Sequence, residues 1–245
     1  MTRYKLTVEY DGTGYVGWQR QDNGPSIQAE LERAVHAFCD EAAIVHGAGR
    51  TDAGVHAEAQ TAHVDIEKDV SAETVRDAMN HFLREIPIAV LRAEVVDDDF
   101  HARYAATARH YRYRILNRRP QPALDAGRVW WVRVRLDADT MADAAQELVG
   151  HHDFTSFRAT LCQARSPVKT LDRLTVSRHE DELVVDVSAP SFLHHQVRNI
   201  VGTLKLVGEG KWTRGDVRDA LAARDRAAGG PTAPADGLCL VRVEY

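Results

Sequence analysis

A short glycine-rich stretch, residues 47–57 (GAGRTDAGVHA), constrains this 245-residue chain more than any other feature. Three glycines, Gly47, Gly49 and Gly54, surround a single aspartate, Asp52. Because glycine adopts backbone conformations closed to other residues and lets other groups approach the main chain, the stretch predicts a tight loop pressed against a sugar, a phosphate or another loop. The aspartate alone is equally compatible with an Asx turn, a common role for aspartate beside glycine.

The bulk composition is that of a globular protein, with 44% hydrophobic and 27% charged residues. No apolar run is long enough to cross a bilayer, and the N-terminus leads directly into strand-like alternation, so we expect a cytoplasmic protein. The three cysteines lie far apart and form no Cys-x-x-Cys pair. The neighbouring histidines at 151–152 and at 194–195 would point in different directions from a helix or strand, so we expect no metal site.

A formal net charge of −5 argues against a general nucleic-acid binder. Charge is nevertheless uneven, because arginines alternate with tyrosines in one stretch. These are Arg103, Arg109, Arg112, Arg114, Arg118 and Arg119. Two interpretations remain open from the residues alone. The arginines either line a basic cleft for RNA phosphates or lie on the solvent-facing side of a strand.

Hydrophobic periodicity predicts strands and helices along the whole chain. We expect strands at 3–10, 61–66, 89–96, 109–116, 129–134, 171–178, 183–188 and 238–243. We expect helices beginning after Ser26, at 71–83, at 138–149, around 197–207 and at 213–223. Strands outnumber the connections that a simple parallel array would need, so the class is α+β with a mixed or antiparallel sheet.

Five blocks resemble, in order, the tRNA pseudouridine synthase A (TruA) family. They are residues 10–19 (YDGTGYVGWQ), 49–56 (GRTDAGVH), 108–113 (ARHYRY), 153–158 (DFTSFR) and 194–202 (HHQVRNIVG). The resemblance implies the pseudouridine synthase fold, with two related α/β halves whose mixed, largely antiparallel sheets join across a central catalytic cleft. It places the aspartate loop in an N-terminal half, 1–105, and the tyrosine strand and arginine helix in a C-terminal half, 106–245.

The resemblance also implies an activity, the isomerisation of uridine to pseudouridine at positions 38–40 in the anticodon stem-loop of tRNA, by a homodimer that needs no cofactor. By the same resemblance Asp52 is the catalytic carboxylate, Arg198 its salt-bridge partner, Arg50 the residue that helps to displace the nucleotide, and Tyr111 the active-site tyrosine. Substrate contacts are expected from Tyr111, Arg50, Arg109, Arg112, Arg118 and Arg119.

The chemistry of these residue types fits the implied roles. A guanidinium near a carboxylate favours its charged form, and a flat phenol can stack on a flipped base. Tyr113 lies two residues from Tyr111 and would face the same side of a strand, where either tyrosine could belong to the core. Gln196, beside the arginine helix, would reach RNA or face solvent. Whether Asp52 attacks the sugar or removes a ribose proton is left open, since both routes use the same carboxylate.

Two other functions compete with an isomerase. A non-catalytic RNA-binding module would explain the arginine and tyrosine stretch but leaves the Asp52 loop without a role. A nucleoside N-glycosidase would also place a carboxylate near the anomeric carbon, although glycoside hydrolysis usually needs a second carboxylate, and none occurs in the five blocks.

Overall fold

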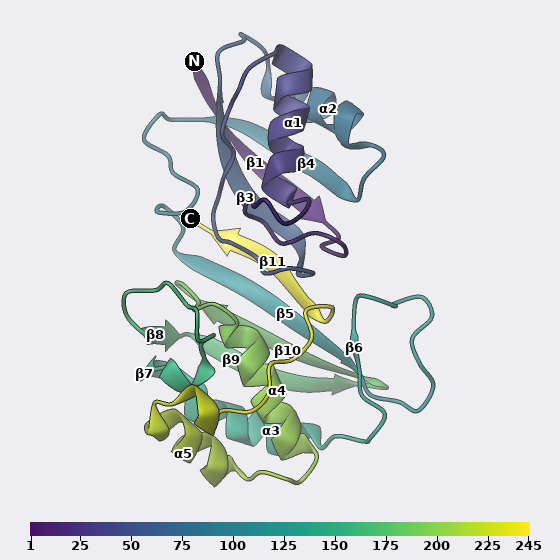
Figure 1. Ribbon diagram of the computed structural model, residues 1–245, viewed down its shortest axis with the longest axis vertical. Helices are drawn as coiled ribbons and strands as arrows, with labels where there is room; N and C mark the ends of the chain where they lie inside the picture. The colour runs from purple at the N-terminus through teal and green to yellow at the C-terminus, as the bar shows by residue number, and fades with distance from the viewer. The chain divides into compact units, whose positions relative to one another are not determined.

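The computed structural model describes residues 1–245, and its chain separates into two compact units. Unit 1 comprises Met1–Thr107 together with Cys239–Tyr245, and unit 2 comprises Ala108–Leu238. Figure 1 labels most helices and strands of both units. No helix combines the length and the hydrophobicity that a transmembrane span requires.

The last strand lies outside the half in which the sequence placed it. The expected second half was 106–245, whereas the C-terminal strand groups with unit 1. Strand pairing is the physical reason. Cys239 and Leu240 run parallel to the start of a unit 1 strand, opposite His56 and Ala57.

The sheet of unit 1 has the order β4-β1-β3-β11, with β2 paired to β3. Its strands are β1 (Thr2–Tyr10), β2 (His46–Gly47), β3 (His56–Ile66), β4 (Ile88–Val96) and β11 (Leu238–Glu244). All neighbours are antiparallel except β11 and β3. The alternation along β1 is confirmed, since Tyr4, Leu6 and Val8 are buried on one face, here called the Leu6 face.

Two helices, α1 (Ile27–Cys39) and α2 (Ala72–Leu83), pack beside one another in unit 1 (Figure 1). Each begins where the sequence predicts. The hydroxyl oxygen of Ser26 accepts a hydrogen bond from the backbone of Ala29, and that of Ser71 accepts one from Thr74. Such caps satisfy a helix-end donor and contribute about 1 kcal/mol each. They fix where both helices start.

Unit 2 contains the antiparallel order β5-β10-β9, with the short β6 parallel to β5, and a separate hairpin of β7 and β8. The strands are β5 (Ala108–Leu116), β6 (Trp130–Trp131), β7 (Gly150–Asp153), β8 (Val168–Leu171), β9 (Arg173–His179) and β10 (Glu182–Ala189). The sequence did not indicate β7, and the strand expected at 171–178 is divided between β8 and β9. The α+β class with mixed, largely antiparallel strands is confirmed.

The strand expected at 129–134 contains only two ladder residues because a side chain replaces a neighbouring strand. Asn117 donates through Nδ2 to the carbonyls of Val132 at 2.9 Å and Val134 at 2.6 Å. Its Oδ1 accepts from the backbone of Leu136 at 2.9 Å. Asn117 itself is buried, so these bonds satisfy backbone groups without a sheet.

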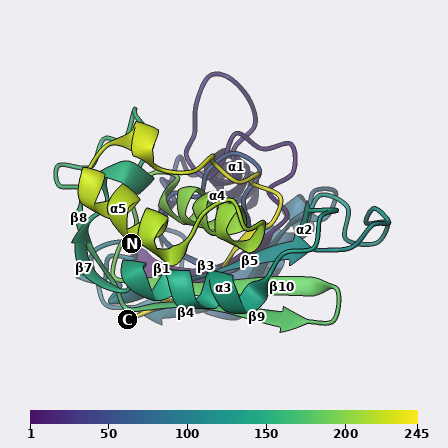
Figure 2. The same ribbon diagram turned by 90° about the horizontal axis from the view of Figure 1, so that it is seen from below.

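The helices of unit 2 are α3 (Ala138–Ala145), α4 (Gln196–Gly208) and α5 (Arg214–Ala223), with 3₁₀ turns at Gln146–Leu148, Thr155–Phe157 and Arg226–Ala228. Figure 2 shows α3 and α4 beside each other. The apolar positions of α4 are all buried, namely Val197, Ile200, Val201, Leu204 and Val207. A capping box between Thr213 and Asp216 begins α5.

Candidate active site

Two buried hydroxyl groups, those of Tyr10 and Thr51, hold the Asp52 loop in place. The Tyr10 and Thr51 hydroxyl oxygens lie 2.8 Å apart, and both residues are buried. Burial raises the pKa of the Tyr10 phenol, which therefore stays neutral and available for hydrogen bonding. The Thr51 carbonyl accepts from the backbone of Trp18 at 3.1 Å. The residue immediately before Asp52 is thus fixed at both its side chain and its backbone.

A buried amide and a backbone turn hold the rest of the loop. Gln60, on β3, donates through Nε2 to the carbonyl of Gly49 at 2.9 Å. The backbone of Val55 donates to the carbonyl of Asp52 at 3.1 Å, which closes a turn around the aspartate. Gly54 has a φ of 78°, a backbone conformation that residues with a side chain rarely adopt. Asp52 is half-buried while Thr51 and Val55 are buried.

The loop is packed closely against other parts of the same chain. A Cβ on Gly12 would lie 2.1 Å from the carbonyl oxygen of Val55, and a Cβ on Gly17 would lie 2.6 Å from that of Thr51. A Cβ on Gly47 would meet the Trp18 ring at 2.5 Å. Gly49 differs, since a Cβ there would meet nothing within 4 Å. Gly12, Gly17 and Gly47 therefore allow close packing around the loop.

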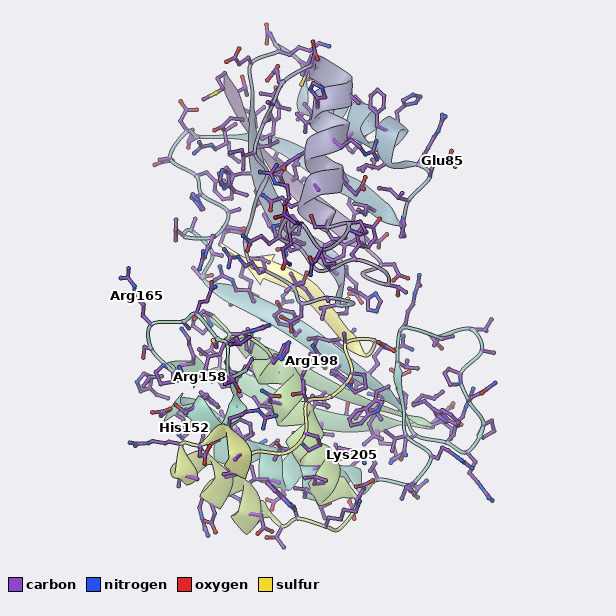
Figure 3. The ribbon with its side chains drawn as sticks, viewed as in Figure 1. Glu85, His152, Arg158, Arg165, Arg198 and Lys205 are labelled. Carbon is purple, nitrogen blue, oxygen red and sulfur yellow. The ribbon has the colours of Figure 1, made fainter.

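Two expected residues of unit 2 lie on β5 and α4. Tyr111 is half-buried on β5, and its ring packs edge-on against Phe192 with centroids 5.3 Å apart. Arg198 is half-buried in the first turn of α4, where Figure 3 labels it. Its Nε donates to the carbonyl of Ala233 at 2.7 Å, which fixes the direction of the guanidinium.

Tyr113 has a different environment from Tyr111. It is fully buried, and its hydroxyl donates to the carbonyl of Pro234 at 2.8 Å. Burial raises the pKa of this phenol. Tyr113 therefore serves the core of unit 2, which leaves Tyr111 as the accessible ring of the strand.

The expected substrate-binding arginines have various partners. The guanidinium of Arg112 lies 3.0 Å from the carboxylate of Asp186, the residue that faces it in the ladder of β5 and β10. The guanidinium of Arg118 lies 3.9 Å from the carboxylate of Asp181. Arg109 donates to the carbonyl of Pro190 at 2.6 Å. Arg119 and Arg50 are exposed. Contact between Arg112 and a phosphate would require exchange of its carboxylate partner, so its RNA-binding role stays a prediction.

Two expectations about α4 and its approach need correction. The rings of His194 and His195 lie against each other, 4.0 Å apart, instead of pointing in different directions. They belong to neither a helix nor a strand, and His195 has a φ of 62°. Gln196 neither faces solvent nor reaches outward. It is buried, and its Oε1 accepts from the backbone of Leu193 at 2.8 Å.

Comparison with known proteins decides the family. A family model described as tRNA pseudouridine synthase matches residues 6–105 and 144–245. Proteins named tRNA pseudouridine synthase A match over the full 245 residues. The identity is 59% for the protein of Paramagnetospirillum magneticum, of which 96% is covered, and 60% for that of Rhodospirillum centenum, of which 100% is covered. The chain belongs to the tRNA pseudouridine synthase family.

The family match includes both the Asp52 loop and Arg198, whereas Tyr111 and the neighbouring arginines lie between its two matched segments. The full-length relatives span that gap. A solved structure, a crystal structure of a Cbf5-Nop10-Gar1 complex, has a TM-score of 0.38 at 11% identity, covering 97% of this chain and 48% of that one. That degree of likeness is too low to place residues.

The supports of the Asp52 loop were not assigned from the sequence. Tyr10 and Trp18 belong to a recognised block, but β1 alternation identified Tyr10 only as a core residue. Gln60 is one of several polar residues of β3, so the sequence did not single it out; its burial and its bond to the carbonyl of Gly49 identify it in the structure.

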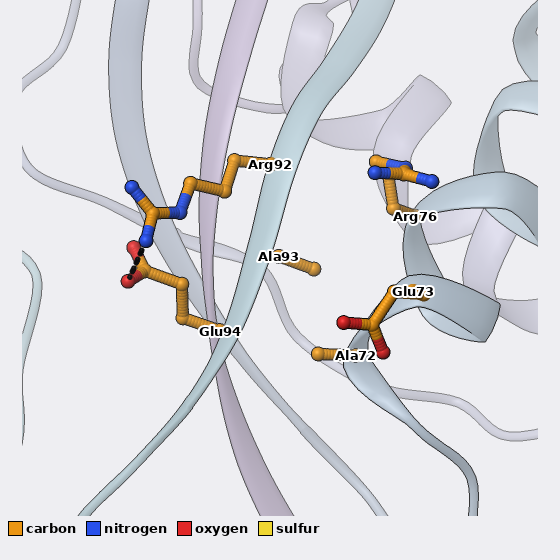
Figure 4. Close-up of a pocket in the computed structure, with 6 residues that line it drawn as sticks. All are labelled: Ala72, Glu73, Arg76, Arg92, Ala93 and Glu94. Carbon is orange, nitrogen blue, oxygen red and sulfur yellow. Dashed lines mark ion pairs between the residues drawn. The ribbon is translucent and has the colours of Figure 1, made fainter.

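A shallow hollow of unit 1 contributes nothing to this site. It lies between α2 and β4 and is lined by Ala72, Glu73, Arg76, Arg92, Ala93 and Glu94 (Figure 4). Arg92 and Glu94 form an ion pair of 2.9 Å there. The hollow contains two acids and two bases, and it borders the Lys5 part of β1 instead of its Tyr10 end.

Proposed function

We propose that this protein isomerises uridine to pseudouridine in tRNA, at positions 38–40 of the anticodon stem-loop. Family membership supports the reaction, and the resemblance of the five blocks supports the anticodon position. The observation that carries the proposal is the Asp52 loop. It presents a half-buried carboxylate on a turn whose two flanking residues, Thr51 and Val55, are buried and hydrogen-bonded.

The reaction makes limited demands, which this loop can meet. The bond between uracil N1 and the ribose breaks, the sugar joins C5, C5 loses a proton and N1 gains one. Nothing is oxidised or reduced. Asp52 acts at the sugar, either as a nucleophile at the anomeric carbon or as a base toward the ribose. A fixed loop places this carboxylate without a rearrangement at the moment of reaction.

The remaining roles are assigned to residues on exposed or half-buried positions. Tyr111 stacks on the flipped base and Arg50 helps to displace the nucleotide. Arg198 binds the Asp52 carboxylate through its terminal nitrogens, since a guanidinium can hold a carboxylate bidentately. Its Nε bond to Ala233 supports this role by setting the orientation of the fork. Arg109, Arg112, Arg118 and Arg119 contact the RNA backbone.

The assembly and location of the protein follow from the same resemblance. We propose a homodimer in which one tRNA contacts both subunits, and a cytoplasmic location, where the substrate is found. Sedimentation of the protein with and without tRNA tests the first of these.

Nucleoside analysis of a tRNA transcript incubated with the protein alone tests the reaction. We expect pseudouridine at positions 38–40 and no free uracil. Release of uracil would instead establish an N-glycosidase, and bound but unchanged tRNA would establish an RNA-binding module. The Asp52→Asn variant is the matched control, since it changes the carboxylate with little change in volume.

A further inference from the structure

Unit 1 carries four aromatic rings in contact with one another on the sheet face opposite the Leu6 face. We call them the platform, and they are His46, His63, His101 and Tyr104. The rings of His46 and His63 are nearly parallel, with centroids 4.9 Å apart. The His63 and His101 centroids lie 4.6 Å apart, and those of His101 and Tyr104 lie 4.3 Å apart. Residues from β2, β3 and the segment after β4 thus form one continuous set of rings.

The platform is anchored at one end and open at the other. His63 is 2% exposed, and its Nδ1 accepts a hydrogen bond from the backbone of Ala102 at 3.2 Å. Tyr104 is 76% exposed, and His46 is also exposed. The backbone of Tyr104 donates to the carbonyl of His101 at 3.1 Å. A fixed backbone therefore presents a large ring that contacts His101 and is otherwise mostly exposed.

The open end carries charges of both signs, and an arginine lies beside the Tyr104 ring. Arg103 is exposed, and its guanidinium carbon lies 5.8 Å from the centroid of the Tyr104 ring. Of the acids on this sheet face, Asp65 is bound to Arg3 at 2.7 Å and Glu94 lies 4.0 Å from Lys5. The exposed aspartates at 97–99 begin the segment that ends in Arg103 and Tyr104. An exposed aromatic ring with an adjacent guanidinium is suited to a base and its phosphate.

The platform connects to the Asp52 loop through hydrogen-bonded backbone. His46 pairs with His63 in the ladder of β2 and β3, and the backbone of Ala48 continues it by donating to the carbonyl of Thr61 at 2.8 Å. Asp52 lies six positions after His46, so the two are within about 20 Å of each other. The Asp52 loop bonds to Tyr10 and Gln60 on the Leu6 face, so an RNA strand that occupies both places passes around the sheet edge at β2.

We propose that the platform stacks an unpaired nucleobase of the RNA substrate on Tyr104 and His46, while Arg103 contacts the adjacent phosphate. This inference rests on the proposed function and adds a second contact for the same strand. Every base has a π face, so stacking holds RNA without selecting a sequence. That property suits an enzyme which accepts several neighbouring uridines.

Binding of a tRNA transcript to Tyr104→Ala and Tyr104→Phe tests the platform. Filter binding should show an affinity weakened about five- to one-hundred-fold for Tyr104→Ala and near-native for Tyr104→Phe, because only the first loses the ring. Leu91→Ala, at a 48% exposed residue of β4, is the matched surface control and should bind as the native protein does. Ultraviolet cross-linking to tRNA containing 4-thiouridine should label the peptide that contains Tyr104.

The outcomes separate the platform from the proposed function. If the native protein forms pseudouridine while Tyr104→Ala binds tRNA with native affinity, the platform is wrong and the activity stands. If Tyr104→Ala changes the sedimentation of the free protein instead of RNA affinity, the surface contacts a second copy, and the platform is again wrong. Cross-linking and weakened binding without any pseudouridine would support the platform and overturn the activity.

Discussion

At the scale of single residues, the residue proposed to react and the residues that hold the Asp52 loop in place are different ones. In the proposed reaction Asp52 supplies the reactive carboxylate, whereas Tyr10, Thr51 and Gln60 are buried and bond to the loop around it. Removing a buried partner costs roughly 1–3 kcal/mol when a group is left unsatisfied. The two kinds of residue should therefore give different phenotypes, since one controls the reaction directly and the others control where the carboxylate lies.

Asp52→Asn should abolish turnover while leaving the protein folded and its tRNA affinity nearly unchanged. The substitution removes the charge that the reaction needs but preserves the size of the side chain. Release of tritium from 5-tritiated uridine in tRNA measures turnover, and filter binding measures affinity. Substantial residual release would remove Asp52 from the catalytic role.

Tyr10→Phe should lower the free energy of unfolding by about 1 kcal/mol and slow turnover without weakening tRNA binding. The hydroxyl that bonds to Thr51 is lost while the ring stays, so the backbone next to Asp52 is held less firmly. Tyr4→Phe is the matched control, because it removes a hydroxyl bonded to the carbonyl of Val70 at the opposite end of the same strand. Urea denaturation and single-turnover rates compare the two. Equal rates for both variants would show that Tyr10 does not position the loop.

At the scale of elements, β3 joins the loop at its start to a buried histidine further along. Burial, with His101 and His46 nearby, lowers the pKa of His63 from 6.5 to about 4. Between these two values the unfolded chain binds a proton that the folded chain does not. The contribution of His63 to the free energy of unfolding should therefore have its full value above pH 6.5 and decrease as the pH falls toward 4.

The expected loss from His63 is roughly 2–3 kcal/mol across that interval. Urea midpoints measured at several pH values between 7.5 and 4.5 give the slope. His63→Gln keeps an acceptor for the backbone of Ala102 but does not titrate, so its slope should be smaller. A slope identical to that of the native protein would show that other groups cause the pH dependence.

Local signals in the sequence predict most elements of this fold. Ser26 and Ser71 identify helix starts, and the alternation along β1 identifies its buried face. The failures are non-local. The strand expected at 129–134 is replaced by bonds to the side chain of Asn117, and β7 depends on pairing with β8. Neither partner can be recognised from a window of neighbouring residues.

In the candidate site, too, local signals were recognised from the sequence and non-local contacts were not. Glycines and the resemblance locate Asp52, but only the structure reveals that Gln60 and Tyr10 hold its loop, because residues far apart in sequence meet there. The platform was missed for the same reason, since His46, His63 and His101 come from separate segments.

At the scale of the whole molecule, the proposed function requires one site from two units, because Asp52 belongs to unit 1 and Arg198 to unit 2. A double-mutant cycle tests this. Asp52→Asn and Arg198→Lys, alone and together, should be non-additive in the free energy of unfolding by roughly 0.5–3 kcal/mol if the two side chains are in contact. Lysine keeps the charge of Arg198 but loses its bidentate fork, so Arg198→Lys should also reduce turnover more than tRNA affinity.

Arg118→Lys combined with Asp52→Asn is the control and should be additive within about 0.5 kcal/mol. Additivity in both cycles, with native turnover for Arg198→Lys, would show that Arg198 is not the partner of Asp52.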